Sequence, residues 1–575
     1  MPVYSVAQML PLLITERIVA YVLMTAPSKH EITGWATRPQ KQRELRTFLS
    51  VSRSWRQAAA LLFYRSAVAK LDNLSGSLFD QKNFVNIDDI VETETQPYLR
   101  ELYIHMYLPN FCQEWEDKDN LGAMLKKWGK LPSVRSLVLF LTFASNRYKD
   151  FTDAQADCAQ DIVESNLQTF ACWIKEQMPH LRKVSVNYDN SRYLPGRLPQ
   201  VDYIISNIGR FFGPDITHAS LDYIDIGKSL MNDISATALR SITIAHHKGT
   251  QKHVELVRRY SASLENLRVS HITVHSVLKM TWGKKGGYHT LVYPRLKHLH
   301  MTFCTGRRDP NARQPLADPF PALQTLICHG NFPFSTPILL SGGRAHIRHL
   351  DIDLDGGIVE MCKPENVFSK WFFQNLTFAS LGSTDRATLP NRVDPMDLFT
   401  MTANLCATTS TMRMRCRTLN PLEGMLSKLS VAKHLQVLEM QHSFIRIDQA
   451  LELFGASPCL MKASIALSRV PEWLSAKMPP AELIQEYQQR YKSHTSTIQS
   501  LNIRRANFQN SRNAAEFIVL LADILPSIKR VSLNISSELC SSDKVIRAVE
   551  FARKRPMYRN HAVANDVEFE QTSYW

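Results

Sequence analysis

The sequence predicts an α/β protein in which a short N-terminal helical module precedes a long, irregular solenoid of strand–helix repeats. A curved parallel sheet is expected, with the helices on its convex side. Three observations predict this fold. One short pattern of apolar residues, called the phrase below, recurs along most of the chain, and segments with helical periodicity lie between its copies. The amphipathic helical patterns at the N-terminus do not recur. At 575 residues the chain is long for one compact core, which favours several domains or a repeat array.

The returning phrase is an apolar residue, two others, an apolar residue, one other and an apolar residue. Its last two apolar positions are two residues apart, as in a short strand with one buried face. Clear copies begin at Leu99, Val134, Leu181, Leu239, Leu264, Leu296, Leu323, Ile347, Leu435, Ile498 and Ile528, and weaker copies begin at Leu221, Phe373 and Leu460. The phrase resembles that of leucine-rich-repeat proteins.

The spacing of the copies supports this resemblance in the middle of the chain. From residue 264 to residue 373 the copies follow at 32, 27, 24 and 26 residues, near the range of about 20 to 29 typical of such repeats. Elsewhere the gaps widen to 58 residues after 181, with the weak copy at Leu221 set aside, and to 62 after 373. We therefore expect an irregular leucine-rich-repeat domain over residues 96–545 and a C-terminal cap or tail over 546–575.

Helical periodicity between the copies predicts the convex layer. Apolar residues recur at steps of three and four in segments beginning at Cys158, Gln251 and Asn513. Each strand–helix unit can bury its apolar face only against its neighbours, which leaves one concave sheet surface exposed.

The N-terminal module is expected to consist of three short helices. The first carries the stripe Leu10, Leu13, Ile14, Ile18 and Val22, the second carries Leu45, Phe48, Leu49, Ser52 and Trp55, and the third carries Ala59, Leu62 and Phe63. Helices this short cannot bury their stripes alone, so they pack on the rest of the chain or offer a face to a partner.

The order of these residues resembles the F-box, and the chain as a whole resembles fungal F-box proteins with irregular leucine-rich repeats. The motif residues are Leu10, Pro11, Ile14, Ile18, Leu45, Val51, Ser52 and Trp55. The module spans 5–70, with a polar insertion at about 24–44, and a connecting segment follows over 71–95. Two departures are Leu13, where an acidic residue is usual, and that insertion. An ordinary three-helix cap on a solenoid is the alternative.

The resemblance implies that the module docks a Skp-type linker and, through it, a cullin. The residues it assigns to this contact are Leu10, Pro11, Ile14, Ile18, Leu49, Val51 and Trp55. The chain would then be the substrate-recognition adaptor of an SCF-type ubiquitin ligase, with the repeats gripping an unknown target protein. Such an adaptor acts by proximity and needs no catalytic residue of its own. A leucine-rich-repeat scaffold without ligase coupling is the alternative.

Composition and charge restrict the remaining classes. The chain has 68 Lys and Arg against 53 Asp and Glu, a net charge of +15. The basic residues are scattered along the sequence, which favours solubility and steering over a nucleic-acid footprint. Ten cysteines without a C-x-x-C pair indicate reduced thiols. Glu16 and Arg17 interrupt any signal-peptide core, and no run of 18 apolar residues occurs. We expect a cytoplasmic or nuclear protein, or one found in both, without a membrane partner.

No catalytic motif is found at readable spacing. Phosphate-binding glycine loops, the zinc-protease motif and the nucleophile elbow are all absent from the sequence. Glycine pairs at 342–343 and 356–357 are explained by turns, and the pair His246–His247 by a surface position. We therefore expect neither an enzyme nor a cofactor.

One polar constellation is expected on the concave face. Because adjacent strands lie about 4.8 Å apart, three consecutive phrases align their outward residues in rows. The rows are His298/Thr325/His349, His300/Ile327/Asp351 and Thr302/His329/Asp353. We expect His329 and Asp353 to be direct lateral neighbours, and His300 and Asp351 to lie two strands apart.

We take this constellation as the candidate substrate-binding site. Its residues are His298, His300, His329, His349, Asp351 and Asp353. A solvated polar face, a metal site and an enzyme active site are the alternatives, although ligands from strands two apart rarely converge at the roughly 2 Å that zinc requires. Target binding at this site is expected to weaken near the histidine titration range, around pH 6.

Overall fold

In the computed structural model of the chain, the residues described fall into two compact units, residues 1–270 and 271–575. The described residues are 55–59, 64–70, 87–107, 121–142, 160–188, 203, 207–222, 237–245, 251–272, 280–281, 290–303, 318–330, 346–353, 374–382, 408–415, 432–467, 481–491, 496–504, 508, 511–533, 542–554 and 568–571.

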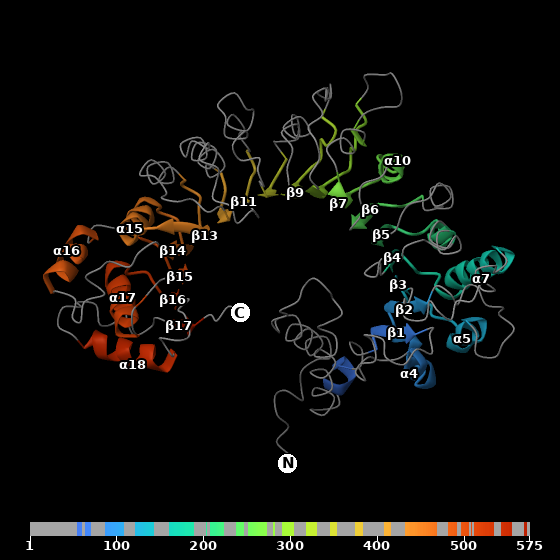
Figure 1. Cartoon of the computed structure of the whole chain (residues 1–575), viewed down its shortest axis with the longest axis horizontal. Helices are drawn as coiled ribbons and strands as arrows, with labels where there is room; N and C mark the ends of the chain where they lie inside the picture. The colour runs from blue at the N-terminus through green and yellow to red at the C-terminus, as the bar shows by residue number, and fades with distance from the viewer. Residues whose placement is uncertain are drawn as a thin grey trace, which may run out of the picture. The chain divides into compact units, whose positions relative to one another are not determined.

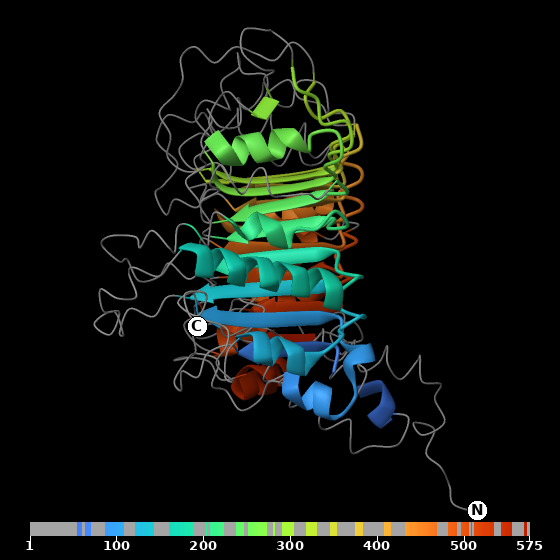
Figure 2. The same cartoon turned by 90° about the vertical axis from the view of Figure 1, so that its right-hand side faces the viewer.

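The first unit is built on parallel strands, each paired with the next along the chain. They are β1 (Ser66–Lys70), β2 (Glu101–Tyr107), β3 (Ser136–Thr142), β4 (Lys183–Tyr188), β5 (His218–Asp222), β6 (Ser241–Ala245) and β7 (Asn266–Ile272). The helices are α4 (Ile87–Glu92), η2 (Gln96–Tyr98), α5 (Leu121–Trp128), α7 (Gln160–Gln177), η5 (Ile208–Phe211) and α10 (Gln251–Arg259). Figures 1 and 2 show α5, α7 and α10 along one face of these strands.

The second unit continues the same plan with parallel strands paired in chain order. They are β8 (His298–Phe303), β9 (Thr325–Gly330), β10 (His349–Asp353), β11 (Phe378–Gly382), β12 (Thr411–Arg415), β13 (Val437–Ile445), β14 (Lys462–Leu467), β15 (Ser500–Arg504), β16 (Arg530–Leu533) and β17 (Glu568–Gln571). The helices are α15 (Ile447–Ala456), α16 (Ala481–Tyr491), α17 (Ser511–Ile524) and α18 (Ser542–Arg553). They lie on the outer side of the arc that these strands follow (Figure 1).

The apolar positions of the phrase form the core between the sheet and the outer layer. In the phrase that leads into β3, for example, Val134, Leu137 and Leu139 are all fully buried. The expected helices at Cys158, Gln251 and Asn513 are confirmed as α7, α10 and α17. The strand–helix units with this phrase form the repeat architecture that the sequence predicts, with parallel strands and an outer helical layer in each unit.

A recurring turn leads the chain into many of the strands. The backbone N–H of the first apolar residue donates to the carbonyl three residues earlier, for example Val134 N to Leu131 O at 3.2 Å. Proline often occupies the second position of this turn, where its fixed φ suits a type I turn. The prolines at this position are Pro97, Pro132, Pro179, Pro214, Pro294, Pro321, Pro458 and Pro526. The proline is therefore a signal of the repeat beside the apolar phrase.

Two repeats begin elsewhere than the sequence predicts. The phrase of β5 begins at Ile216 and not at Leu221, and that of β11 begins at Leu376 and not at Phe373. In both strands Ala occupies the second apolar position, so the copies are weak in the sequence. The copy at Leu460 is confirmed, because Leu460 is buried and leads into β14.

A further repeat was missed. The phrase of this repeat is Thr409, Met412 and Met414, and all three side chains are fully buried. The two methionines lie in β12, and Thr409 occupies the first position, where the clear copies have an apolar residue. A polar residue there conceals the phrase in the sequence. The 58- and 62-residue gaps therefore contain β5 and β12, together with the true start of β11.

The ends of the sheet depart from the ranges expected from the sequence. Strand β1 pairs with β2 and lies inside the 5–70 range assigned to the helical module. Strand β17 pairs with β16 and lies inside the 546–575 range assigned to a cap or tail.

Most of the predicted F-box docking residues lie outside the described part of the chain: Leu10, Pro11, Ile14, Ile18, Leu49 and Val51. Trp55 is described; it begins a helical stretch, 55–59, with a half-buried side chain. Across the described residues, no helix has the length and apolarity needed to cross a membrane.

Candidate functional site

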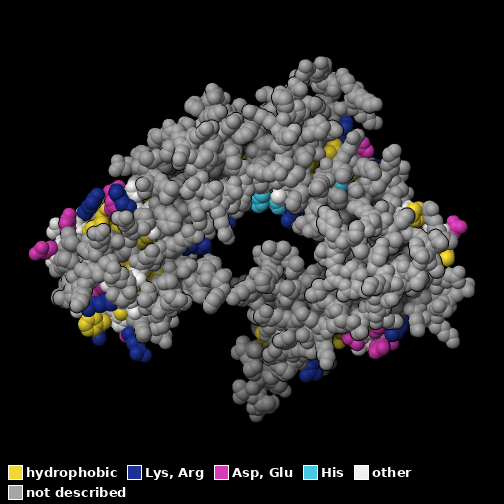
Figure 3. Space-filling view, in the orientation of Figure 1, with side chains coloured by type: hydrophobic (Ala, Val, Ile, Leu, Met, Phe, Trp, Pro, Cys, Tyr) yellow, Lys and Arg dark blue, Asp and Glu magenta, His cyan; other side chains and the backbone are white. Residues whose placement is uncertain are grey.

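The strand register brings the expected rows together on the inner face of the second unit, the face opposite its helices. His298 pairs with Thr325, and Thr325 with His349; His300 pairs with Ile327, and Ile327 with Asp351. Thr302 pairs with His329, as the third row requires. Figure 3 shows histidine side chains gathered on the inner side of the arc. We call His298, His300, His329, His349 and Asp351 the histidine patch.

His329 has an acidic neighbour that the rows do not pair with it. Its Nε2 lies 3.6 Å from Oδ2 of Asp351, a diagonal contact across β9 and β10. This distance is too long for a hydrogen bond but permits an ion pair when the ring is protonated. The ring of His300 packs edge-on against that of His329, with centroids 5.3 Å apart. Asp353 ends β10 and its side chain lies outside the described residues.

The structure extends the patch with side chains that the sequence did not single out. The ring of His349 stacks on Phe378 with centroids 4.2 Å apart and planes 4° from parallel. The guanidinium of Arg413 lies 5.7 Å from the centre of the Phe378 ring, on the next strand. We call His349, Phe378, Arg413 and Glu439 the stacked ladder. It was missed because the phrase of β11 was misplaced and that of β12 was not found.

The far end of the stacked ladder is fixed by a forked ion pair. Arg413 donates from Nε to Oε2 of Glu439 at 2.6 Å and from Nη2 to Oε1 at 3.3 Å. Such two-point pairs fix the guanidinium plane as well as its position. The ladder is therefore a pre-ordered surface of ring and guanidinium planes spanning β10 to β13.

Burial governs the titration of His349. Desolvation lowers its pKa from the usual 6.5, the nearby charges of Arg413 and His298 lower it further, and Asp351 opposes them. Behind the patch, burial raises the pKa of the Cys328 thiol well above its ordinary value. Cys328 is fully buried and stays a protonated core residue, which suits neither a nucleophile nor a thiolate ligand.

A pH dependence follows from the lowered pKa of His349. As pH falls below 6.5, His349 takes up a proton in the unfolded chain before it does so in the folded chain. The free energy of unfolding is therefore highest above pH 6.5 and falls as pH drops from 6.5 toward the lower pKa of the folded state. We expect His349→Gln to flatten the dependence of the urea midpoint on pH between pH 7 and pH 5. The exposed His346→Gln is the control, and an unchanged slope in His349→Gln would contradict this assignment.

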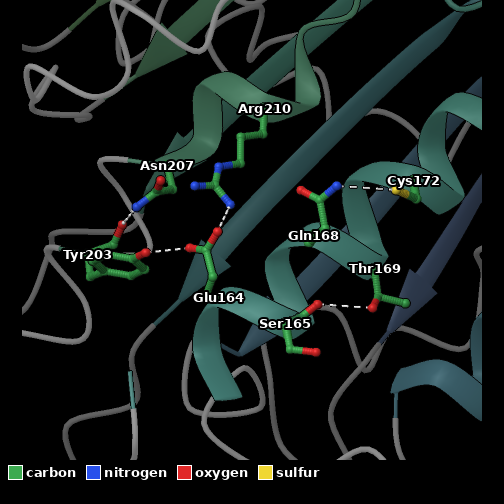
Figure 4. Close-up of polar contacts among 8 residues, drawn as sticks. All are labelled: Glu164, Ser165, Gln168, Thr169, Cys172, Tyr203, Asn207 and Arg210. Carbon is green, nitrogen blue, oxygen red and sulfur yellow. Dashed lines mark hydrogen bonds and ion pairs between the residues drawn. The ribbon is translucent and has the colours of Figure 1, made fainter. Parts of the chain in front are cut away.

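A second polar cluster lies in the first unit, between α7 and η5. Glu164 accepts hydrogen bonds from the Tyr203 hydroxyl and from Nη1 of Arg210 (Figure 4). These two donors, Arg210 first, lower the pKa of the Glu164 carboxyl. Asn207 Nδ2 donates to the Tyr203 carbonyl at 2.8 Å. The carboxylate is satisfied by both donors, so the cluster acts as a structural link between helix and turn.

The described residues contain no group of three or more His, Cys, Asp or Glu that could hold a metal ion. His300 and Asp351 lie on strands two apart, and His329 approaches Asp351 at ion-pair distance. The side chains on this face form a surface of rings and paired charges.

Comparisons with known proteins do not assign this chain to a family. No family model matches it, and no curated protein matches it. Among solved structures, an internalin (inlF) from Listeria monocytogenes str. 4b F2365 is similar at 11% identity and a TM-score of 0.28, covering 78% of this chain and 87% of that one. The leucine-rich repeat-containing protein LegL7 from Legionella pneumophila is similar at 11% identity and a TM-score of 0.27, covering 63% of this chain and 96% of that one.

Both TM-scores are low, so the class rests on the chain's own phrase, register and burial. The protein is an α/β repeat protein in which each unit carries parallel strands and outer helices, as is typical of leucine-rich repeats, and the second unit has a ring-rich inner face over β8–β13.

Proposed function

We propose that this chain is a non-catalytic interaction scaffold that holds a target protein on the inner face of its second unit. One observation carries the proposal: the stacked ladder orders aromatic and guanidinium groups across four neighbouring strands before any partner arrives. Aromatic and arginine side chains dominate the energetics of protein interfaces, and pre-ordering reduces the entropy lost on binding.

We further propose that the N-terminal residues couple this scaffold to an SCF-type cullin ubiquitin ligase in the cytoplasm or nucleus. The support is the order of Leu10–Pro11, Val51–Ser52 and Trp55 in the sequence. The chain would supply proximity, and the bond-making chemistry would come from the ligase.

Co-purification of the full chain with a Skp-type linker tests the coupling. We expect wild type to retain the linker and Leu10→Ala/Trp55→Ala to lose it, because both changes remove apolar side chains from the docking stripe. Phe551→Ala, at a side chain 64% exposed on α18, is the control and should retain it. A wild-type chain that does not retain the linker would refute the coupling and leave a scaffold without ligase function.

A further inference from the structure

A row of arginines lines the edge of the first unit where its strands begin. Each residue immediately precedes the first residue of a strand, and the strands concerned are β1, β2, β3, β4 and β6. Its members are Arg65, Arg100, Arg135, Arg182 and Arg240. At β5 the position is Thr217. All of these arginines are exposed except Arg100, which is half-buried. We call them the arginine row.

The backbone fixes the spacing of the row. The carbonyl of Arg65 accepts from the N–H of Arg100 at 2.8 Å and of Glu101 at 3.0 Å. The carbonyls of Arg100 and Arg135 accept in the same way from the following repeat. The first four members are therefore held on neighbouring strands, about 4.8 Å apart, and Arg240 follows one strand further on.

Little negative charge opposes the row. Arg65 and Arg135 form no ion pair with any residue that the structure describes. Arg100 donates from Nη1 to the carbonyls of Pro97 and Ser133, at 3.0 and 3.2 Å, which are neutral acceptors. The counter-charges come at the later strands, where Arg182 pairs with Asp215 at 3.3 Å and Arg240 pairs with Glu265 at 3.5 Å. Like charges on neighbouring strands repel, so we expect the first three members to lower stability unless an anion covers them.

The fold does not require arginine at this position. In the second unit the same backbone bonds are made by residues that are mostly uncharged. Those residues are Lys297, Gln324, Arg348, Thr377, Ser410, Gln436, Met461, Gln499 and Lys529. Any residue can supply the carbonyl, so the concentration of guanidinium groups in the first unit is a property of its surface.

We propose that the arginine row binds an acidic helical segment of a partner protein. Carboxylates three and four residues apart on one helix face are about 5–6 Å apart, close to the spacing of the row. Guanidinium forks bind carboxylates at two points. A nucleic-acid strand fits less well. Proteins that bind single strands stack the bases on aromatic rings along a basic groove. The described residues beside this row offer the exposed ring of Tyr98 on η2, and the acids Asp215 and Glu265 at the far end of the row would repel phosphates. The surface is separate from the stacked ladder, and the proposal does not depend on the proposed function.

Binding of a labelled peptide to the full chain tests this proposal by fluorescence anisotropy. The probe is a three-turn helical peptide with glutamates at successive i, i+4 positions. We expect the triple variant Arg65→Gln, Arg135→Gln, Arg182→Gln to bind it at least about tenfold more weakly, since each exposed ion pair contributes modestly. The matched control is Lys297→Gln, Arg348→Gln, Lys529→Gln, which removes the same charge at the same position of the second unit. It should change affinity by less than about twofold.

Equal weakening by both triple variants would overturn the proposal, because net charge alone would then explain binding. Unchanged affinity in the arginine variant would overturn it as well. A single-stranded oligouridylate is the second probe; tighter binding of this probe, lost in the arginine variant, would make the row a nucleic-acid surface instead. If the triple variant unfolds, the single variant Arg135→Gln replaces it, because the Arg135 side chain is exposed. We expect its affinity for the peptide to be about twofold to threefold weaker than that of wild type.

Discussion

Replacing Phe170 by Ala is expected to destabilise the first unit by about 3–5 kcal/mol, the range for removing a buried Phe side chain. Phe170 is fully buried on α7. Its ring stacks on Trp173 with centroids 6.0 Å apart and meets Phe211 edge-on at 5.2 Å. Trp173 in turn contacts Trp128 on α5 at 5.8 Å. The side chain thus joins α7 to η5 directly and α5 through Trp173, and its loss leaves a cavity among the rings.

Urea unfolding followed by tryptophan fluorescence measures this effect. Tyr98→Ala is the control in the same unit, because Tyr98 is 45% exposed, and it should cost less than about 0.5 kcal/mol. Because repeat units contact mainly their neighbours, amide hydrogen exchange in Phe170→Ala should accelerate in α5, α7 and β4 and stay unchanged in β14–β16. A loss below about 1 kcal/mol would show that the cluster collapses around the missing ring.

Removing the stacked ladder is expected to abolish most target binding while the chain stays folded. The variant is Phe378→Ala, Arg413→Ala, Glu439→Ala, in which both partners of the ion pair go together. Removing Arg413 alone would leave the largely covered carboxylate of Glu439 without its guanidinium, and stability would then fall for a reason unrelated to binding. An aromatic or arginine hot spot contributes about 2 kcal/mol or more, so capture of the target should fall at least about thirtyfold.

Quantitative affinity capture from cells compares this variant with wild type and with Arg348→Ala. Arg348 is exposed and lies beside His349 in the chain, but at the edge where β10 begins. Proteins retained by wild type and Arg348→Ala and lost from the ladder variant are the targets expected. Identical captured sets in all three chains would place target binding elsewhere.

The site was predictable from the sequence in its rows but not in its contacts. The phrases at Leu296, Leu323 and Ile347 set the pairing of His298 with Thr325 and of His300 with Ile327, because a one-residue slip would expose every buried leucine. The pairing of His329 with Asp353 stays a prediction, and the rows did not predict the diagonal approach of Asp351 to His329. Side-chain rotamers decide such contacts, and the phrase does not encode them.

The stacked ladder and the arginine row could not be predicted from the sequence, because their members are brought together only by the pairing of the strands. Phe378 and Arg413 are next to each other only after β11 and β12 take their places, and Thr409 conceals the repeat that carries Arg413. The arginines before β1 to β4 are 35 to 47 residues apart in the chain, so their alignment appears only when each carbonyl accepts from the next repeat.

The sequence by itself determined the class of fold, the strands with a clear phrase and the existence of a histidine-rich inner face. These follow from local spacing, since an apolar residue at fixed intervals must face the core wherever the chain is a strand. Only the tertiary structure decided where the weak repeats begin, which side chains stack and which charges gather at the strand edge. These depend on residues far apart in the chain, brought together by packing and backbone hydrogen bonds between repeats.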